Sequence, residues 1–106
     1  MSVRIASSNL NQTPLDWRGN FNNIKESISL AKENKVEILC LPELSITGYG
    51  CQDLFYHDWF IKKSNDVLDE IRILSKSITV IVGHPLSYNN KNYNSCCIIR
   101  DQKILG

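Results

Sequence analysis

The chain has 106 residues, enough for one small domain or part of a larger one, and its 42% hydrophobic and 22% charged residues are typical of globular proteins. Its 12 basic and 11 acidic residues are interspersed and give a net charge of +1, which provides no reason to expect nucleic acid or an anionic membrane as partner. The start of the chain is unlike a signal peptide, no apolar run reaches the roughly 20 residues of a membrane helix, and the 4 cysteines lack zinc-site spacing, so we expect a cytoplasmic protein with reduced thiols and no bound metal.

The first half of the chain predicts a strand, a helix and a second strand. Residues 3–10 begin with β-branched residues and alternate weakly, which indicates a strand. Apolar side chains then recur at intervals of four and three, which predicts an amphipathic helix with Asp16 as N-cap and its end near Asn34. The nearly continuous apolar run at 36–41 predicts a strand covered on both faces and stopped by Pro42.

The following stretch predicts a long loop and a second helix. Residues 45–58 contain two glycines and mixed polarity, which indicates a loop with a short helical turn. Within this loop, Asp53 is interpreted as a helix N-cap. Helical spacing of apolar residues from about Trp59 to Ser75 predicts the second helix, in which Ser64 fills one position of the apolar face.

The last third predicts three extended segments. Residues 78–82 form an apolar run that predicts a strand ending at Gly83. The turn-rich residues 84–92 predict a connection, and residues 93–100 and 103–105 predict two strands with a tight turn between them.

The order of these elements, β-α-β-α-β-β with apolar central strands, predicts an α/β layered sheet. Glu43 follows the carboxyl end of a predicted buried strand, which is the edge where ligand sites gather in such folds. The sequence stops at Gly106 in an extended segment, and part of a layered fold leaves apolar faces and a strand edge open. We therefore expect the chain to form a homo-oligomer or to pack against further polypeptide.

Four segments resemble one known family in their order along the chain. Pro42–Phe55, PELSITGYGCQDLF, resembles the glutamate motif of the nitrilase superfamily, and more narrowly the P-E-L-x-x-T-G-Y form in the glutaminase domains of glutamine-dependent NAD synthetases. Arg4–Asn20 resembles the opening strand and turn of this family, and Val80–Leu86 resembles its third strand and G-x-P turn. Tyr93–Leu105 resembles its Y-N-S/A strand and hairpin.

This resemblance implies a partial α-β-β-α sandwich, in which residues 1–106 are the N-terminal part of a carbon-nitrogen hydrolase (glutaminase) domain. It implies a Glu-Lys-Cys triad that hydrolyses glutamine to glutamate and ammonia. The ammonia would serve the ATP-dependent amidation of nicotinate adenine dinucleotide to NAD on a separate synthetase domain, which would use ATP and magnesium. No cofactor is implied for the present segment.

The resemblance implies roles for two residues of this chain. Glu43 matches the general base, which takes the proton of the nucleophilic thiol and later activates water. We expect its position after a buried strand to give it a rigid, partly desolvated mounting. Tyr49 matches a residue that lines the glutamine pocket or the ammonia exit. The stretch 50–53 departs from the P-P-E-D form of bacterial homologues, which leaves the pocket and the subfamily open.

The lysine and the cysteine of the triad are not found among these residues. Lys103 matches the hairpin position that precedes the catalytic lysine, so it is not given that role. No cysteine of the chain matches the motif of the nucleophile. The two residues are therefore expected beyond Gly106, and residues 1–106 alone are expected to be inactive.

The remaining reactive side chains are interpreted first as structural. Cys40 is expected to be a small buried residue of a strand, and Cys51 either packs or contacts the site. Cys96 and Cys97 are adjacent and should face opposite sides of a strand. The two histidines, at positions 57 and 84, have no evident catalytic partner.

Two other functions remain open from the sequence. The chain could belong to a nitrilase-type amidase that acts on another small amide or nitrile, or to a non-catalytic interaction module that has kept the fold. The presence of a lysine and a cysteine at the expected places in further sequence would distinguish an enzyme from such a module.

Overall fold

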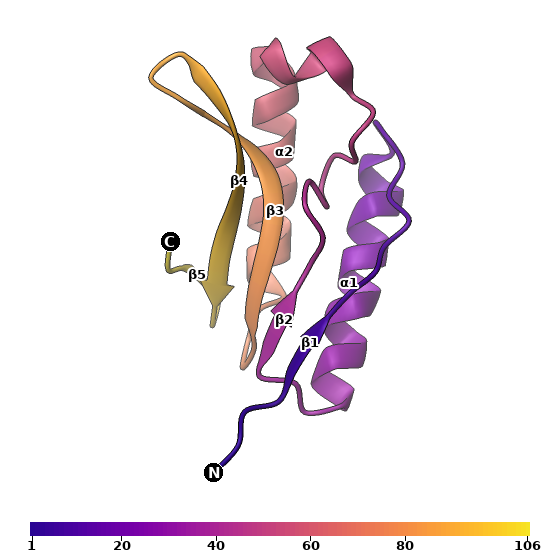
Figure 1. The fold of residues 1–106 in the computed structure, drawn as a ribbon, viewed down its shortest axis with the longest axis vertical. Helices are drawn as coiled ribbons and strands as arrows, with labels where there is room; N and C mark the ends of the chain where they lie inside the picture. Colours follow the sequence, from indigo (N-terminus) through magenta and orange to yellow (C-terminus); the bar gives the residue numbers. More distant parts are fainter.

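The computed structural model describes all residues from Met1 to Gly106 and consists of one sheet and two α-helices (Figure 1). The alternation of strands and helices is the predicted one, including the short strand at the end. In chain order the elements are β1 (Ile5–Ser7), α1 (Trp17–Glu33), β2 (Ile38–Cys40), the 3₁₀ turn η1 (Gln52–Tyr56), α2 (Asp58–Ile73), β3 (Thr79–Tyr88), β4 (Lys91–Arg100) and β5 (Lys103–Ile104).

The sheet follows the order of the chain, β1-β2-β3-β4-β5. The first three strands are parallel, and α1 and α2 form the connections between them. The last three strands are antiparallel and joined by tight turns. Both helices lie behind the sheet in Figure 1, so they cover the same face. The carboxyl ends of β1, β2 and β3 therefore meet at one edge, the edge expected to carry a site.

The helices begin and end close to the predicted positions. Asp16 is the N-cap of α1, and its carboxylate accepts a hydrogen bond from the backbone N–H of Gly19 at 3.0 Å. Asn34 is the C-cap of the same helix. In α2, Ser64 lies in the buried face as predicted, and its hydroxyl has no hydrogen-bond partner. Neither helix combines the length and the apolar character that crossing a bilayer requires.

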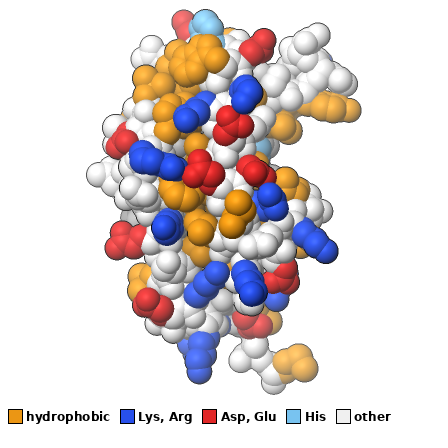
Figure 2. Space-filling view, turned by 180° about the vertical axis from the view of Figure 1, so that it is seen from behind, with side chains coloured by type: hydrophobic (Ala, Val, Ile, Leu, Met, Phe, Trp, Pro, Cys, Tyr) orange, Lys and Arg blue, Asp and Glu red, His pale blue; other side chains and the backbone are white.

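The core fills the space between the helices and one face of the sheet. A cluster of 16 buried apolar residues combines side chains of both helices with the inward-facing positions of the strands. Among its fully enclosed members are Ile24, Ile71, Val80 and Ile99. The outer side of the helices carries acidic and basic side chains in close alternation, with no basic stripe on the face that Figure 2 shows.

The opposite face of the sheet carries no helix, and we call it the open face. Ile5 and Ile98 lie on it, 70% and 37% exposed. The prediction that β2 is covered on both faces is therefore wrong, and so is the prediction that Cys40 is buried. Side chains alternate along a strand, so Leu39 enters the core while its neighbour points to the uncovered side. Cys97 is buried and Cys96 exposed, which confirms that the pair faces opposite sides.

The predicted connection at 84–92 is also wrong, because β3 continues through Gly83 to Tyr88 and pairs with β4 over its whole length. The actual turn contains only Asn89 and Asn90, with φ of 50° and 59°. Asparagine tolerates this left-handed conformation, which two-residue hairpin turns require. Pro85 is accepted within β3 because β2 pairs only with its beginning, so one side of the strand needs no N–H donor at this point.

Candidate functional site

The backbone of the candidate site leaves β2 and stays close to β3. The N–H of Leu41 donates to the carbonyl of Ile81 at 2.9 Å, which extends the pairing by one residue before Pro42. Glu43 follows immediately, past the carboxyl end of the strand, as predicted. Leu44 then adopts a positive φ of 47°, which turns the chain into a compact loop closed by the bond from the N–H of Gly48 to the carbonyl of Leu44 at 2.8 Å.

Gly83 allows this loop to lie against β3. A Cβ atom at this position would come within 2.6 Å of the carbonyl oxygen of Pro42, 2.7 Å of the nitrogen of Leu44 and 2.9 Å of the Cα of Glu43. All three are backbone atoms, so no side chain could move aside to relieve the contact. The carbonyl of Gly83 also accepts the hydroxyl of Ser45 at 3.2 Å, which fixes the loop in its place.

The loop after Glu43 is buried and held from below by α1. Its residues Ser45, Ile46 and Thr47 are at most 1% exposed. Asn20, itself 1% exposed, donates through Nδ2 to the carbonyls of Ile46 at 3.1 Å and Thr13 at 2.8 Å, and it accepts the N–H of Thr13 at 2.8 Å. The opening segment of the chain, the first helix and the loop are thus joined by one buried amide.

A second amide reinforces this support. Nε2 of Gln12 donates to the carbonyl of Ser45 at 2.5 Å and to the carbonyl of Asn20 at 3.1 Å. The sequence contained both residues within the segment Arg4–Asn20 that resembles the family, but gave neither of them a role. Their function is visible only once the loop and the segment are brought together.

The carboxylate of Glu43 has one donor on each oxygen. Nδ2 of Asn94, on β4, donates to Oε1, and the hydroxyl of Tyr49 donates to Oε2 at 3.3 Å. All three side chains are exposed. The expected desolvation of Glu43 is therefore not found in this chain, because the open face leaves the carboxylate accessible to water. Its orientation is fixed by hydrogen bonds instead.

The hydroxyl of Tyr49 lies at hydrogen-bonding distance from Glu43, and this neighbour affects the ionisation of the phenol. The pKa of the phenol lies above its usual value, because reduced contact with solvent and the negative charge of Glu43 both disfavour the phenolate. Tyr49 therefore remains protonated near neutral pH and acts as a hydrogen-bond donor. Whether it also contacts a substrate is part of the proposal below.

A cavity of about 200 Å³ opens beside the carboxylate, between η1 and the β3–β4 hairpin. Phe55, Tyr56 and Tyr93 contribute to its wall, and so does Asn94, which binds Glu43. The carboxylate thus lies next to a cavity with aromatic walls. Asn94 was missed at the level of sequence, although the Y-N-S string that contains it was recognised as part of a family strand.

The other candidate side chains lie apart from this arrangement. Lys103 pairs with Arg100, which is opposite Thr79 at the start of β3, whereas Asn94 is opposite Pro85 in the second half of that strand. Cys51 is buried, and its thiol donates to the carbonyl of Thr47 at 3.3 Å. Burial raises the pKa of this thiol, so the packing interpretation agrees with its surroundings.

Three further polar residues have structural surroundings. The prediction of Asp53 as a cap is wrong, because the residue at the N-cap of η1 is Cys51 and no side chain caps this turn. His84 is buried, with Nδ1 2.9 Å from the carbonyl oxygen of Pro85, and burial lowers its pKa. His57 is exposed at the N-cap position of α2. No three His, Cys, Asp or Glu side chains gather in a way that could hold a metal ion.

Comparison with known proteins identifies the relatives of this arrangement. The carbon-nitrogen hydrolase family model matches residues 4–106. The glutamine-dependent NAD(+) synthetase of Dictyostelium discoideum is 38% identical over 97% of this chain, which corresponds to 15% of that relative. These two matches confirm the resemblance found in the motifs. The chain thus spans about one seventh of the length of the curated relatives that it matches.

Solved structures agree in fold. The crystal structure of a glutamine-dependent NAD(+) synthetase from Cytophaga hutchinsonii superimposes with a TM-score of 0.95 and 43% identity, over 98% of this chain and 18% of that protein. A Nesterenkonia amidase of the nitrilase superfamily superimposes with a TM-score of 0.81 over 98% of this chain and 41% of its own. Its identity is only 20%, so this second likeness shows the fold alone.

Proposed function

The chain belongs to the carbon-nitrogen hydrolase family, and on this premise we propose that residues 1–106 are the opening part of a glutaminase domain in a glutamine-dependent NAD synthetase. The whole protein would hydrolyse glutamine to glutamate and ammonia and use the ammonia to amidate nicotinate adenine dinucleotide to NAD. The observation that carries the proposal is the carboxylate of Glu43, held by two donors above a buried loop in a chain that is 38% identical to a glutamine-dependent NAD(+) synthetase.

In this proposal Glu43 is the general base. It takes the proton of a cysteine thiol supplied by polypeptide outside the 106 residues, and the thiolate attacks the carboxamide carbon of glutamine. A lysine, also outside these residues, stabilises the oxyanion that forms. The C–N bond then breaks, the protonated Glu43 returns its proton to the leaving nitrogen, and ammonia departs from a thioester. Glu43 next takes a proton from water, which hydrolyses the thioester to glutamate and restores the thiol.

The two hydrogen bonds suit this role. Asn94 and Tyr49 each donate to one oxygen of the carboxylate and so hold its orientation. Each oxygen of a carboxylate can accept more than one hydrogen bond, so Glu43 keeps the capacity to receive a proton. The rigid loop below it provides the fixed position that proton transfer requires.

The proposal extends to the surroundings of the site. Tyr49 would contact glutamine at the cavity, and the open face with Ile5 and Ile98 would be covered by the remainder of the same domain or by a second subunit of a homo-oligomer. ATP and magnesium would be bound by a separate synthetase domain. The four free cysteines fit a reducing compartment such as the cytoplasm.

The decisive experiment replaces Glu43 by glutamine in the full-length protein. Loss of the base should lower glutamine-driven NAD formation by about 10²- to 10⁴-fold, while free ammonium still supports the reaction. Glu33→Gln, at the exposed end of α1, is the matched control and should leave both activities unchanged. If Glu43→Gln removes the ammonium-driven activity as well, the residue is structural, and if both activities survive, the assigned base is wrong.

A further inference from the structure

Asn94 approaches Glu43 from a part of the molecule that the motif around Glu43 does not include. The two residues are 51 positions apart, and the side-chain amide of Asn94 donates to Oε1 of Glu43. Asn94 lies in β4 opposite Pro85, within a pairing of β3 and β4 that runs without interruption from Thr79 and Arg100 to Tyr88 and Lys91. Its position is therefore set by the longest ladder of the sheet.

Tyr49, the other donor, is held less firmly. It belongs to the loop after β2, its side chain is 64% exposed, and its bond to Oε2 is long, at 3.3 Å. The two oxygens of Glu43 are thus held with different firmness. Oε1 is bound from a paired strand, whereas Oε2 is bound by a loop residue through a weaker hydrogen bond.

We propose that Asn94 is a positioning residue that anchors Oε1 of Glu43, so that Oε2 is the oxygen that exchanges its partner and accepts the proton. This inference rests on the proposed function, because it concerns the same base. An amide does not titrate, so Asn94 donates to the carboxylate at every working pH.

The inference has a consequence for kcat. Without the amide donor, Oε1 of Glu43 is no longer held by β4, so the carboxylate spends less time in the orientation that presents Oε2 to the thiol. A second carboxylate at position 94 removes the same donor and repels Glu43, so it should lower kcat further.

The test uses Asn94→Leu, which keeps the size and removes the donor, and Asn94→Asp, which keeps the shape and adds a charge, both in the full-length protein. For Asn94→Leu we expect the kcat of glutamine hydrolysis to fall about ten- to a hundredfold. KM should change less than about twofold, because only the base is affected. Asn22→Leu, an exposed asparagine of α1, is the matched control and should change none of these quantities.

The remaining measurements separate this inference from a structural role and from the proposed function itself. Asn94 is exposed, so both variants are expected to fold and to retain ammonium-driven activity. If either variant fails to fold, the kinetics of the other decide. A rise in KM as large as the loss of kcat would overturn the positioning role, and so would unchanged kinetics of both variants. If Glu43→Gln abolishes the glutamine-driven activity while the Asn94 variants keep it in full, only the inference on Asn94 fails. If Glu43→Gln keeps the glutamine-driven activity, the proposed function fails.

Discussion

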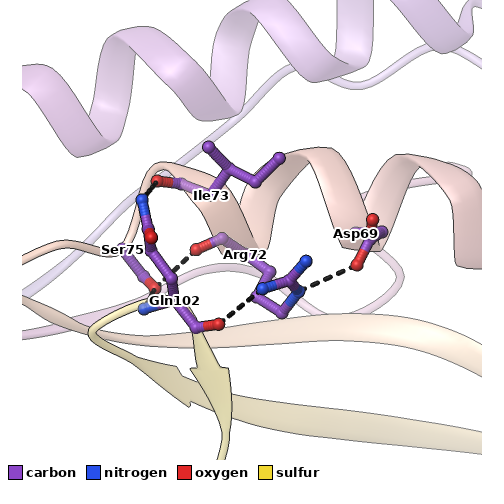
Figure 3. Close-up of polar contacts among 5 residues, drawn as sticks. All are labelled: Asp69, Arg72, Ile73, Ser75 and Gln102. Carbon is purple, nitrogen blue, oxygen red and sulfur yellow. Dashed lines mark hydrogen bonds and ion pairs between the residues drawn. The ribbon is translucent and has the colours of Figure 1, made fainter.

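Two polar corners of this molecule connect distant segments in different ways. The first, which we call the site corner, consists of Glu43, Tyr49 and Asn94. The second, which we call the helix corner, joins the end of α2 to the turn between β4 and β5 (Figure 3). Its members are Asp69, Arg72, Ile73, Ser75 and Gln102.

In the helix corner, side chains bond mainly to backbone groups. The guanidinium of Arg72 pairs with Asp69 at 2.8 Å and donates to the carbonyl of Gln102 at 2.6 Å. The hydroxyl of Ser75 donates to the carbonyl of Arg72 at 2.7 Å and accepts the N–H of Gln102 at 2.9 Å. The side chain of Gln102 in turn donates to the carbonyl of Ile73 at 3.0 Å. These bonds satisfy carbonyls that the end of a helix leaves without partners.

The site corner has no such backbone partners, because its three side chains bond only to one another. The rigid part of this region is the loop beneath the three side chains. Asn20 holds this loop by a hydrogen bond, and Gly83 allows it to lie close to β3. A carboxylate on a fixed backbone with exchangeable side-chain partners can receive and return a proton, whereas the bonds of the helix corner hold α2 to the β4–β5 turn. Changes below the site corner should therefore reduce both stability and activity, and changes in the helix corner should reduce stability alone.

Asn20→Ala should have the largest effect. It removes three hydrogen bonds and leaves the buried carbonyl of Ile46 and the partly buried carbonyl of Thr13 without this donor, so we expect the free energy of unfolding to fall by about 3 kcal/mol. Urea unfolding measures this loss. Glutamine-driven activity of the full-length protein should fall with it, because the loop that carries Glu43 loses its support.

The exposed Asn22 of the same helix provides the comparison. Asn22→Ala should change the free energy of unfolding by less than about 0.5 kcal/mol. Equal effects of the two substitutions would contradict the role of Asn20 as a buried link between the helix and the loop.

Gly83→Ala should be the next most damaging change. The added methyl group would meet three backbone atoms of residues 42–44 at less than 3.0 Å, so the loop must move away from β3. We expect a loss of about 2 to 3 kcal/mol, measured by urea unfolding, and a reduced kcat with glutamine.

Gly50→Ala is the matched control for this substitution. A Cβ at that position meets only Cγ of the Pro14 side chain, at 3.1 Å, so the effect should stay below about 1 kcal/mol. A tolerated Gly83→Ala would show that the close approach of the loop to β3 is not required.

The helices could be predicted closely because their signals are local. The cap Asp16 and apolar residues at intervals of three and four define α1. The predicted start and end of this helix lie within two residues of the observed bounds. The outer half of β3 could not be predicted in this way. It extends past the end of β2 with residues such as Pro85 and Ser87, whose types favour turns, and only its pairing with β4 keeps it extended.

The same distinction applies to the site. Glu43 was recognisable because its motif is contiguous in sequence. Asn94 was not, because its contact with Glu43 depends on the register between two strands and on the course of a loop 51 residues away. The exposure of Asn94 could not be predicted either, because the polarity of one chain segment does not show which face of a sheet remains uncovered. A single sequence thus located Glu43 and Tyr49 but not Asn94.

Ser75→Ala, in the helix corner, should have the smallest effect of the three substitutions and should separate the two regions. Ser75 is fully buried, and its hydroxyl is the partner of the Gln102 N–H, so its removal should cost about 1 to 2 kcal/mol in urea unfolding. Ser87→Ala, on the exposed part of β3, should cost less than about 0.5 kcal/mol. In the full-length protein, Ser75→Ala should leave the kcat with glutamine unchanged at temperatures where the protein remains folded. A fall in kcat comparable to that of Gly83→Ala would mean that the helix corner also positions Glu43, and that the two regions are not independent.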